Sequence, residues 1–156
     1  MTIHAVRIVK AKHAANAFSG DGARRFGGRW NLPGMAMVYT AGSASLAILE
    51  MLVHFKSDEL LKKYVLFDVT FDEALVNRVD PAILPKTWRR SPASASVQRI
   101  GSAWVEGGAS AVLRVPSTIV SSEWNYLLNP AHADFPAIKI GLKKSVQFDA
   151  RLMKRP

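Results

Sequence analysis

The order of the predicted secondary-structure elements constrains the fold of this chain more than any other feature of its sequence. Segments rich in β-branched and aromatic residues stand near both ends and throughout the second half, and only two segments have the length and pattern of helices. The regular alternation of strand and helix that is typical of a parallel sheet is missing from the sequence. We therefore expect an α+β fold, in which residues 1–156 form a single compact domain with mixed or antiparallel sheets and a few helices.

The predicted strands are short, and turn-forming residues separate them. We expect strands at residues 3–9, 35–41, 64–71, 111–115, 118–120, 124–128, 138–140 and 146–152. Between the first two of these strands, residues 19–28 contain four glycines, a serine and an aspartate, which predicts a mobile loop. Two further glycine-containing turns follow at residues 33–34 and 107–108.

Residues 43–55 predict the first helix, because Ser43 or Ser45 can cap it and an apolar run follows. The run is apolar nearly all round, so we expect the helix to be buried on most sides. Glu50 interrupts this run, and a carboxylate is costly to bury unless it is paired or functional. An ion pair with a nearby arginine, or hydrogen bonds to a sheet edge, would account for Glu50 as well as a catalytic role would. The second helix is predicted at residues 94–106.

The chemistry open to the chain is limited by what the sequence lacks. It contains no cysteine, which excludes disulfides, thiolate metal sites and a nucleophilic thiol. Its four histidines show no metal-ligand spacing with carboxylates, so we expect no metal. Neither a signal-peptide core nor an apolar run of membrane-spanning length occurs, which predicts a cytoplasmic protein without a membrane partner.

The net charge of +9 is concentrated at the two ends of the chain. Residues 1–31 and residues 139–156 each contain six Lys or Arg and one Asp. Such basic segments fit nucleic acid, an anionic small ligand or an acidic partner protein, and they are equally compatible with a solvated surface. Aromatic residues are not interleaved with these clusters and no nucleic-acid-binding signature is present, which counts against direct binding of nucleic acid. Because of the basic charge, a nucleic-acid-binding module is kept as an alternative of a different class.

Several polar and aromatic residues could form a binding site, although each also has an ordinary structural explanation. Glycines 27 and 28 would let a ligand approach the backbone closely, and the guanidinium of Arg29 could hold a phosphate. Trp30 could stack on the ligand or anchor the loop, and Tyr39 could stack on a heterocycle or lie in the core with a satisfied hydroxyl. Ser117 and Asn125 could orient a ribose or an amide, or they could be turn residues.

Taken together, five short motifs resemble the RES domain family, which is named after a shared arginine, glutamate and serine. These motifs are GRWN at residues 28–31, VYTA at 38–41, SLAILE at 45–50 followed by VH at 53–54, VPS at 115–117, and EWNYLLNPAH at 123–132. The resemblance extends from about residue 7 to about residue 141. It implies a fold similar to that of ADP-ribosyltransferase toxins. It also implies the toxin component of a type II toxin–antitoxin system that consumes NAD, with an Xre-type helix-turn-helix antitoxin blocking the active site.

By position, the resemblance implies that Arg29, Tyr39 and Glu50 are the catalytic residues. Ser117 follows a proline as the family pattern expects, but Ser121 and Ser122 are alternatives for the family serine. NAD would be held by the residues Arg29, Trp30, Tyr39, Ser117 and Asn125. The resemblance leaves open whether water, phosphate or a protein attacks the ribose, and therefore whether the enzyme is an NAD glycohydrolase, an NAD phosphorylase or a protein ADP-ribosyltransferase. The basic C-terminal segment could dock an acidic surface of the antitoxin.

Overall fold

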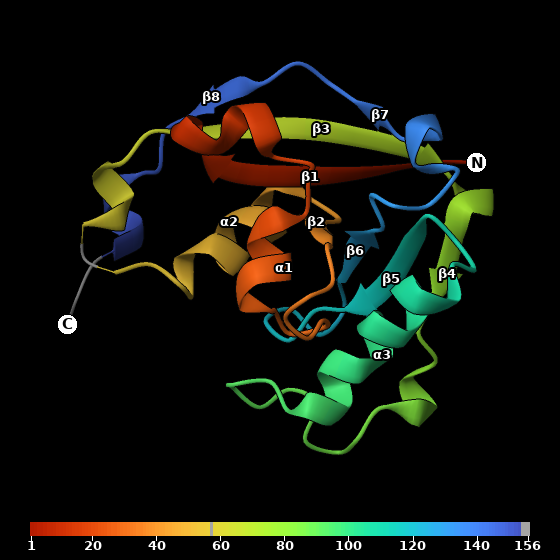
Figure 1. The fold of residues 1–156 in the computed structure, drawn as a ribbon. Helices are drawn as coiled ribbons and strands as arrows, with labels where there is room; N and C mark the ends of the chain where they lie inside the picture. Colours follow the sequence, from red (N-terminus) through yellow and green to blue (C-terminus); the bar gives the residue numbers. More distant parts are fainter. Residues whose placement is uncertain (57, 154–156) are drawn as a thin grey trace.

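The longest strand pairing in the molecule joins β1 (Thr2–Lys10) to β3 (Tyr64–Asp72) in one antiparallel register along their whole length. Figure 1 shows the computed structural model of the chain, which describes residues 1–56 and 58–153. Along β3, buried residues alternate with more exposed ones, as expected for a strand that turns one face toward the core. The two long strands form one side of the molecule, and the shorter strands continue the sheet from β1.

The strands form one eight-stranded sheet in the order β4-β5-β6-β2-β1-β3-β7, and β8 also pairs with β3. The remaining strands are β2 (Val38–Ala41), β4 (Val76–Arg78), β5 (Val112–Pro116), β6 (Trp124–Leu128), β7 (Lys139–Ile140) and β8 (Lys144–Val146). Only β4 and β5 pair in parallel among the described residues. The sheet is therefore mixed and mainly antiparallel.

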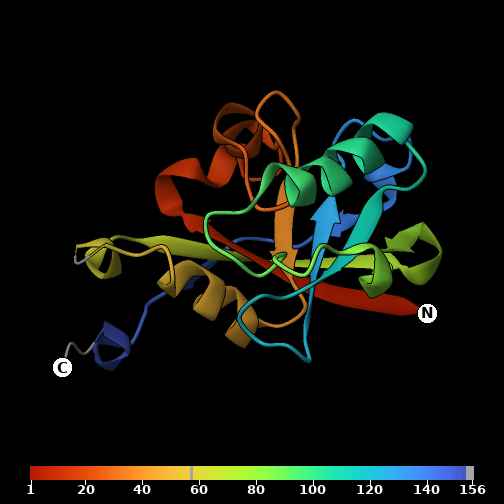
Figure 2. The same ribbon diagram turned by 90° about the horizontal axis from the view of Figure 1, so that it is seen from below.

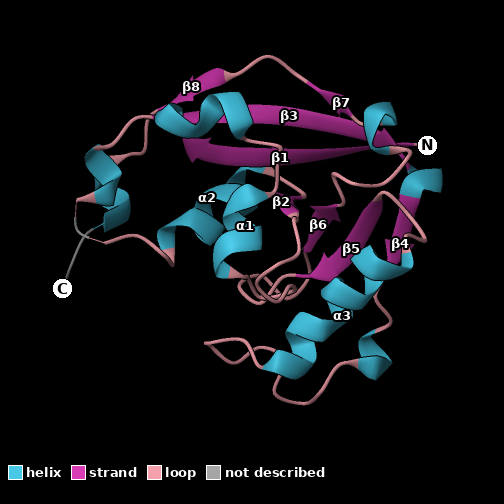
Figure 3. Ribbon diagram, viewed as in Figure 1, coloured by secondary structure: helices cyan, strands magenta, loops and turns pink. Residues whose placement is uncertain are grey.

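Three α-helices cover parts of this sheet: α1 (Asp21–Phe26), α2 (Ala44–Leu52) and α3 (Ala95–Gly107). Short 3-10 turns lie at Ala11–Asn16, Glu59–Leu61, Glu73–Leu75, Pro81–Ile83, Phe135–Ala137 and Ala150–Met153. Figure 3 shows α3 lying along the short strands, and Figure 2 shows α1 and α2 on either side of β1 and β2. No helix in the described part of the chain is long and apolar enough to cross a bilayer.

The core is divided between the two faces of the sheet. On one face, Val97 and Trp104 of α3 pack against side chains of β5 and β6. Leu46 and Ala47 of α2 pack against β1 and the end of β2 in a separate cluster. The opposite face of the short strands meets β1 and β3 in a third cluster that contains the fully buried Val69. The short strands β5 and β6 are thus covered on both faces.

The predicted α+β class is confirmed, as are both predicted helices and most of the predicted strands. Ser43 is the N-cap of α2, because its Oγ accepts a hydrogen bond of 3.1 Å from the backbone N–H of Leu46. Gly108 ends α3 in a left-handed conformation with φ of +62°. The predicted strand at residues 35–41 forms only from Val38 onward.

Two predicted strands are wrong, and in each a side chain turns the backbone. Residues 118–120 form a loop, because Ser117 Oγ accepts hydrogen bonds from the N–H groups of Ile119 and Val120. Residues 146–152 contain only the end of β8, after which the Asp149 carboxylate accepts from the N–H of Arg151 and a 3-10 turn follows. Lys154 and Arg155 of the basic C-terminal segment lie outside the described residues.

The burial predicted for the first helix is also wrong. Only Leu46 and Ala47 of α2 are buried, whereas Leu49 is 38% exposed and the following Val53 is 60% exposed. The helix packs on the sheet with one side and borders a large cavity, so the apolar run is not enclosed by protein. This exposed apolar surface lies beside the cavity described next.

Candidate active site

A cavity of about 840 Å³ is lined by residues of β1, β2, α1 and α2, among other segments. It is lined by residues from seven segments between Val6 and Asn125, and among them are Arg29, Trp30, Tyr39, Glu50 and Asn125. The structure thus brings five of the six predicted site residues to one cavity. Pockets of about 300–1,000 Å³ are typical for small ligands and cofactors.

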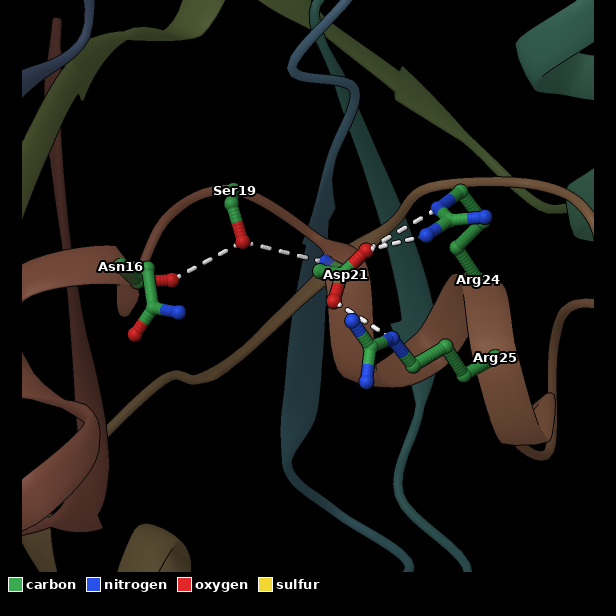
Figure 4. A network of polar contacts seen from close by, with 5 residues as sticks. All are labelled: Asn16, Ser19, Asp21, Arg24 and Arg25. Atoms are coloured by element: carbon green, nitrogen blue, oxygen red, sulfur yellow. Dashed lines mark hydrogen bonds and ion pairs between the residues drawn. The ribbon is translucent and has the colours of Figure 1, made fainter.

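The approach to this cavity is built by α1, where the sequence predicted a mobile loop. Figure 4 shows that Asp21 accepts hydrogen bonds from Arg24 (Nη2–Oδ1 2.5 Å) and forms an ion pair with Arg25 (Nε–Oδ2 2.8 Å). Ser19 Oγ donates to the carbonyl of Asn16 and accepts from the N–H of Asp21. The Arg24 hydrogen bond is the main cause that lowers the pKa of the Asp21 carboxyl. These contacts order one turn of helix directly before the glycine pair.

The turn that carries Arg29 is held by the Tyr39 hydroxyl. This hydroxyl donates to Asn31 Oδ1 at 2.6 Å and accepts from the backbone N–H of Trp30 at 3.0 Å. A Cβ atom on Gly28 would lie 2.6 Å from the Tyr39 hydroxyl oxygen, so the close approach requires glycine. Burial raises the pKa of Tyr39 well above its usual value. The hydroxyl therefore serves to hold the turn, while the residue also borders the cavity.

Two neighbours of Arg29 hold this turn in the protein interior. Asn31 is fully buried, and its Nδ2 donates to three carbonyls, those of Ala23, Leu32 and Met35. Trp30 is 2% exposed and packs against Trp88 with ring centroids 6.2 Å apart. Trp30 therefore anchors the turn, and because it also lines the cavity, its stacking on a ligand stays a prediction.

Glu50 lies on the cavity wall and is oriented by two side chains. Its Oε1 accepts hydrogen bonds from Asn125 Nδ2 at 2.7 Å and from Ser117 Oγ at 3.2 Å. No cation forms an ion pair with it among the described residues, so the ion-pair explanation does not apply. A carboxylate held through one oxygen leaves its other oxygen for a ligand.

Ser117 itself lies beneath the cavity surface. It is fully buried, and its hydroxyl accepts from two backbone N–H groups while it donates to Glu50. Its hydroxyl therefore contacts Glu50, and Ser117 is not among the residues that line the cavity, so its part in binding a ligand stays a prediction. Ser121 and Ser122 are exposed in the loop that follows. The three serines that the sequence could not separate therefore occupy quite different environments.

Arg7 is a cavity residue that the sequence reasoning did not single out. Its Nε donates to the carbonyl of Ala17 at 2.6 Å and its Nη1 to the carbonyl of Tyr39 at 2.8 Å. Burial lowers the pKa of Arg7 to about 10, so the side chain remains cationic at neutral pH. No acidic side chain pairs with it in the described part of the chain. The sequence did contain a signal for Arg7, because residues 5 and 7 of a strand lie on the same face and Ala5 is an apolar residue suited to the core.

The charge of the cavity is strongly uneven. Glu50 is its one acidic lining residue among those the structure describes, and Arg7, Arg29 and Arg89 line it as well. Unpaired arginines around a cavity attract a ligand with phosphate or carboxylate groups. Nowhere in residues 1–56 and 58–153 do three metal-ligating side chains cluster. The arginines therefore suit a ligand with several negative charges, and the carboxylate of Glu50 would lie beside one point of that ligand.

The chain is similar to known proteins over most of its length. The RES domain model matches residues 4–149 of the chain. A "Toxin Res" of Yersinia enterocolitica is 40% identical over 147 residues, which cover 94% of this chain and 97% of that protein. A "Prs ADP-ribosylating toxin" of a Sphingobium species is 39% identical over 146 residues, covering 92% of this chain and 91% of that protein.

A solved structure shares the fold. The chain is similar to a chain in the crystal structure of the Mycobacterium tuberculosis MbcT–MbcA toxin–antitoxin complex, with a TM-score of 0.77 and 20% sequence identity. The match covers 94% of this chain and 85% of the other. This likeness shows that the chain shares the fold of that structure.

Proposed function

The chain belongs to the RES domain family, and from this membership we propose that it is the toxin of a bacterial toxin–antitoxin pair and cleaves the nicotinamide–ribose bond of NAD. The observation that carries the proposal is the cavity itself, which is lined by one oriented carboxylate, that of Glu50, and by three arginines. NAD has the matching chemistry, because it combines a pyrophosphate with a ribose that becomes positively charged during cleavage.

The proposed reaction assigns a distinct task to each group. Nicotinamide leaves NAD as a neutral molecule from a cationic precursor, so its departure needs no general acid. The transition state resembles an oxocarbenium ion, as in glycoside cleavage. Glu50 would stabilise this charge with its free oxygen and hold a ribose hydroxyl. The ring of Tyr39 would stack on nicotinamide or on the adjacent ribose.

The remaining contacts concern binding. The field of Arg7, Arg29 and Arg89 would attract the pyrophosphate into the cavity. Asn125 lines the cavity and donates from Nδ2 to Glu50, so it would hold this carboxylate beside the ribose. We expect no metal to take part.

Product analysis tests the proposal directly. Purified protein without antitoxin should release nicotinamide from NAD, and chromatography with and without phosphate should identify ADP-ribose or its phosphorylated form. Cleavage only in the presence of phosphate would identify a phosphorylase, and cleavage in buffer alone a glycohydrolase. Unchanged NAD after prolonged incubation with folded protein in both buffers and with cell lysate would rule out NAD cleavage.

Transfer of ADP-ribose to a protein is the second candidate, and the name of the Sphingobium relative favours it. The same cavity would serve, with a protein side chain replacing water or phosphate as the acceptor. Labelled NAD incubated with cell lysate should then give a labelled protein band instead of free ADP-ribose.

The proposed partner is an Xre-type helix-turn-helix antitoxin that blocks the cavity in the cytoplasm. We expect nucleic acid to be contacted only through this antitoxin. The idea that the basic C-terminal segment docks the antitoxin remains a prediction, and Lys144 of that segment forms an ion pair with Asp68. Reversing Lys143 and Lys144 to glutamate should weaken antitoxin binding, and an unchanged affinity would contradict this docking.

Ser117→Ala should lower kcat for NAD cleavage by about tenfold, because the variant removes one of the two donors that orient Glu50. It should also lower stability by about 1–3 kcal/mol, since the N–H groups of Ile119 and Val120 lose their acceptor. Steady-state kinetics and thermal unfolding measure the two effects. The matched control is Ser121→Ala, in which an exposed serine of the same loop is removed and neither quantity should change.

A further inference from the structure

One wall of the cavity is a segment without helix or strand, residues 84–94, which leads into α3. In Figure 1 it is the green chain at the bottom of the molecule, and in Figure 2 it crosses in front of β1 and β2. Arg89, Ser91, Pro92 and Ala93 of this segment line the cavity. A segment without ladder hydrogen bonds needs other contacts to hold it in one place.

Arg29 supplies these contacts. Its Nη1 donates to the carbonyls of Trp88 at 3.0 Å and Arg90 at 2.8 Å, and its Nη2 donates to Ser91 Oγ at 2.9 Å. Charge-assisted hydrogen bonds of this kind are about twice as strong as neutral ones. A planar guanidinium can bridge three acceptors that a single ammonium group cannot reach in the same geometry. Both terminal nitrogens of Arg29 are therefore engaged by residues 88–91.

Two more contacts join the same parts of the chain. Gln98 Nε2 on the first turns of α3 donates to the carbonyl of Gly28 at 3.0 Å. The rings of Trp30, which follows Arg29, and of Trp88 pack together. The turn at residues 28–31 is therefore joined to the segment before α3 and to α3 itself, and Arg29 makes most of the hydrogen bonds between them.

We propose that Arg29 is a positioning residue that fixes the segment of residues 84–94 as a wall of the cavity, and that the anion contacts fall to Arg7 and Arg89. The nature of the anion rests on the proposed function, but the positioning role does not. Both N–H groups of Arg29 Nη1 and one of the two on Nη2 are engaged, so a phosphate that bound both terminal nitrogens would have to displace at least one of the hydrogen bonds that hold the wall. Arg89 lies on the segment that Arg29 holds and lines the cavity, with its guanidinium 4.8 Å from the centre of the Trp88 ring.

Limited digestion with trypsin tests the proposal without any substrate. The held segment contains the cleavage sites Lys86, Arg89 and Arg90, so intact-mass analysis reports its opening directly. Arg29→Lys and Arg29→Gln should raise the cleavage rate at these sites by about tenfold or more. Cleavage after Lys63, counted in the same digest, should not change and would reveal global unfolding if it did.

Two further variants keep the test decisive. Arg24→Gln removes the same charge from the neighbouring helix without touching the segment, and it should leave cleavage at residues 86–90 unchanged. Ser91→Ala removes one of the three acceptors and should raise cleavage by a smaller factor, so it serves if the Arg29 variants do not fold. Unchanged cleavage of the segment in folded Arg29 variants, or in Ser91→Ala if neither Arg29 variant folds, would overturn the proposal.

A second arm asks whether substrate takes Arg29 away from the segment. NAD is added to the Glu50→Gln protein, in which the dinucleotide should remain intact. Under the proposal, saturating NAD leaves cleavage at residues 86–90 unchanged or slows it. Faster cleavage with NAD would mean that Arg29 leaves the wall to bind the ligand, and the positioning role would be wrong. Failure of NAD to react with the wild-type protein would contradict the proposed function and leave the substrate-free digestion interpretable.

Discussion

Glu50→Gln should lower the rate of NAD cleavage by about a hundredfold or more while the protein stays folded. Glutamine has nearly the same shape, and its carbonyl oxygen can still accept from Ser117 and Asn125. It lacks the negative charge that would stabilise the oxocarbenium-like transition state. Losing one such electrostatic contact typically costs about 3 kcal/mol of activation free energy, which corresponds to this factor.

The measurement is nicotinamide release at saturating NAD, together with circular dichroism and the thermal midpoint of each protein. Glu106→Gln is the control, because Glu106 is an exposed carboxylate on α3 and is not among the residues that line the cavity. It should retain wild-type activity. A folded Glu50→Gln protein with activity within a few-fold of wild type would remove Glu50 from the proposed mechanism.

The second large effect concerns stability. Gly101 lies in the middle of α3, where the helix crosses the turn that carries Arg29. A Cβ atom at this position would lie 1.9 Å from the backbone carbonyl oxygen of Trp30 and 3.1 Å from the terminal methyl of Met37. Backbone cannot move aside as a flexible side chain can, so Gly101→Ala should force α3 away from the turn.

Overpacking a core usually costs about 1–3 kcal/mol, and we expect Gly101→Ala to exceed this range. A loss of about 3 kcal/mol would lower the thermal midpoint by about 10 °C in a chain of this size. Gly107→Ala is the matched control in the same helix, since no atom lies within 4 Å of the added Cβ. Alanine should stabilise that position slightly through its helix propensity. An equal midpoint for the two variants would contradict the packing explanation.

Activity should follow the Gly101→Ala change as well. Gln98 and Ser102 of the same helix hold the turn through the carbonyl of Gly28 and the N–H of Leu32. Displacing α3 would therefore disturb the turn that places Arg29. NAD cleavage measured well below the midpoint of the variant should be reduced even where the protein is folded.

The sequence predicted secondary structure well where local chemistry decides it. The cap at Ser43 and the glycine stop after α3 act over a few residues, so their signals are legible in one segment. The prediction of a loop at residues 19–28 was wrong because three of the four glycines lie outside the short helix α1, in which Asp21 pairs with the arginines that follow it. The burial of α2 was overestimated, because an apolar run does not reveal whether its outer side meets protein or a cavity.

For the candidate site, the sequence alone marked Glu50 as a carboxylate out of place, and the family motifs grouped it with Arg29 and Tyr39. Only the tertiary structure decided what these side chains touch. It brought Ser117 and Asn125 to one oxygen of Glu50 across more than sixty residues, and it revealed Arg7 as a half-buried cation with no acidic partner among the described residues. It also showed that the guanidinium of Arg29 donates its hydrogen bonds to residues 88–91. The physical reason is that residue type and local spacing carry propensity and charge, whereas hydrogen-bond partners are selected by contacts that form only when distant segments pack together.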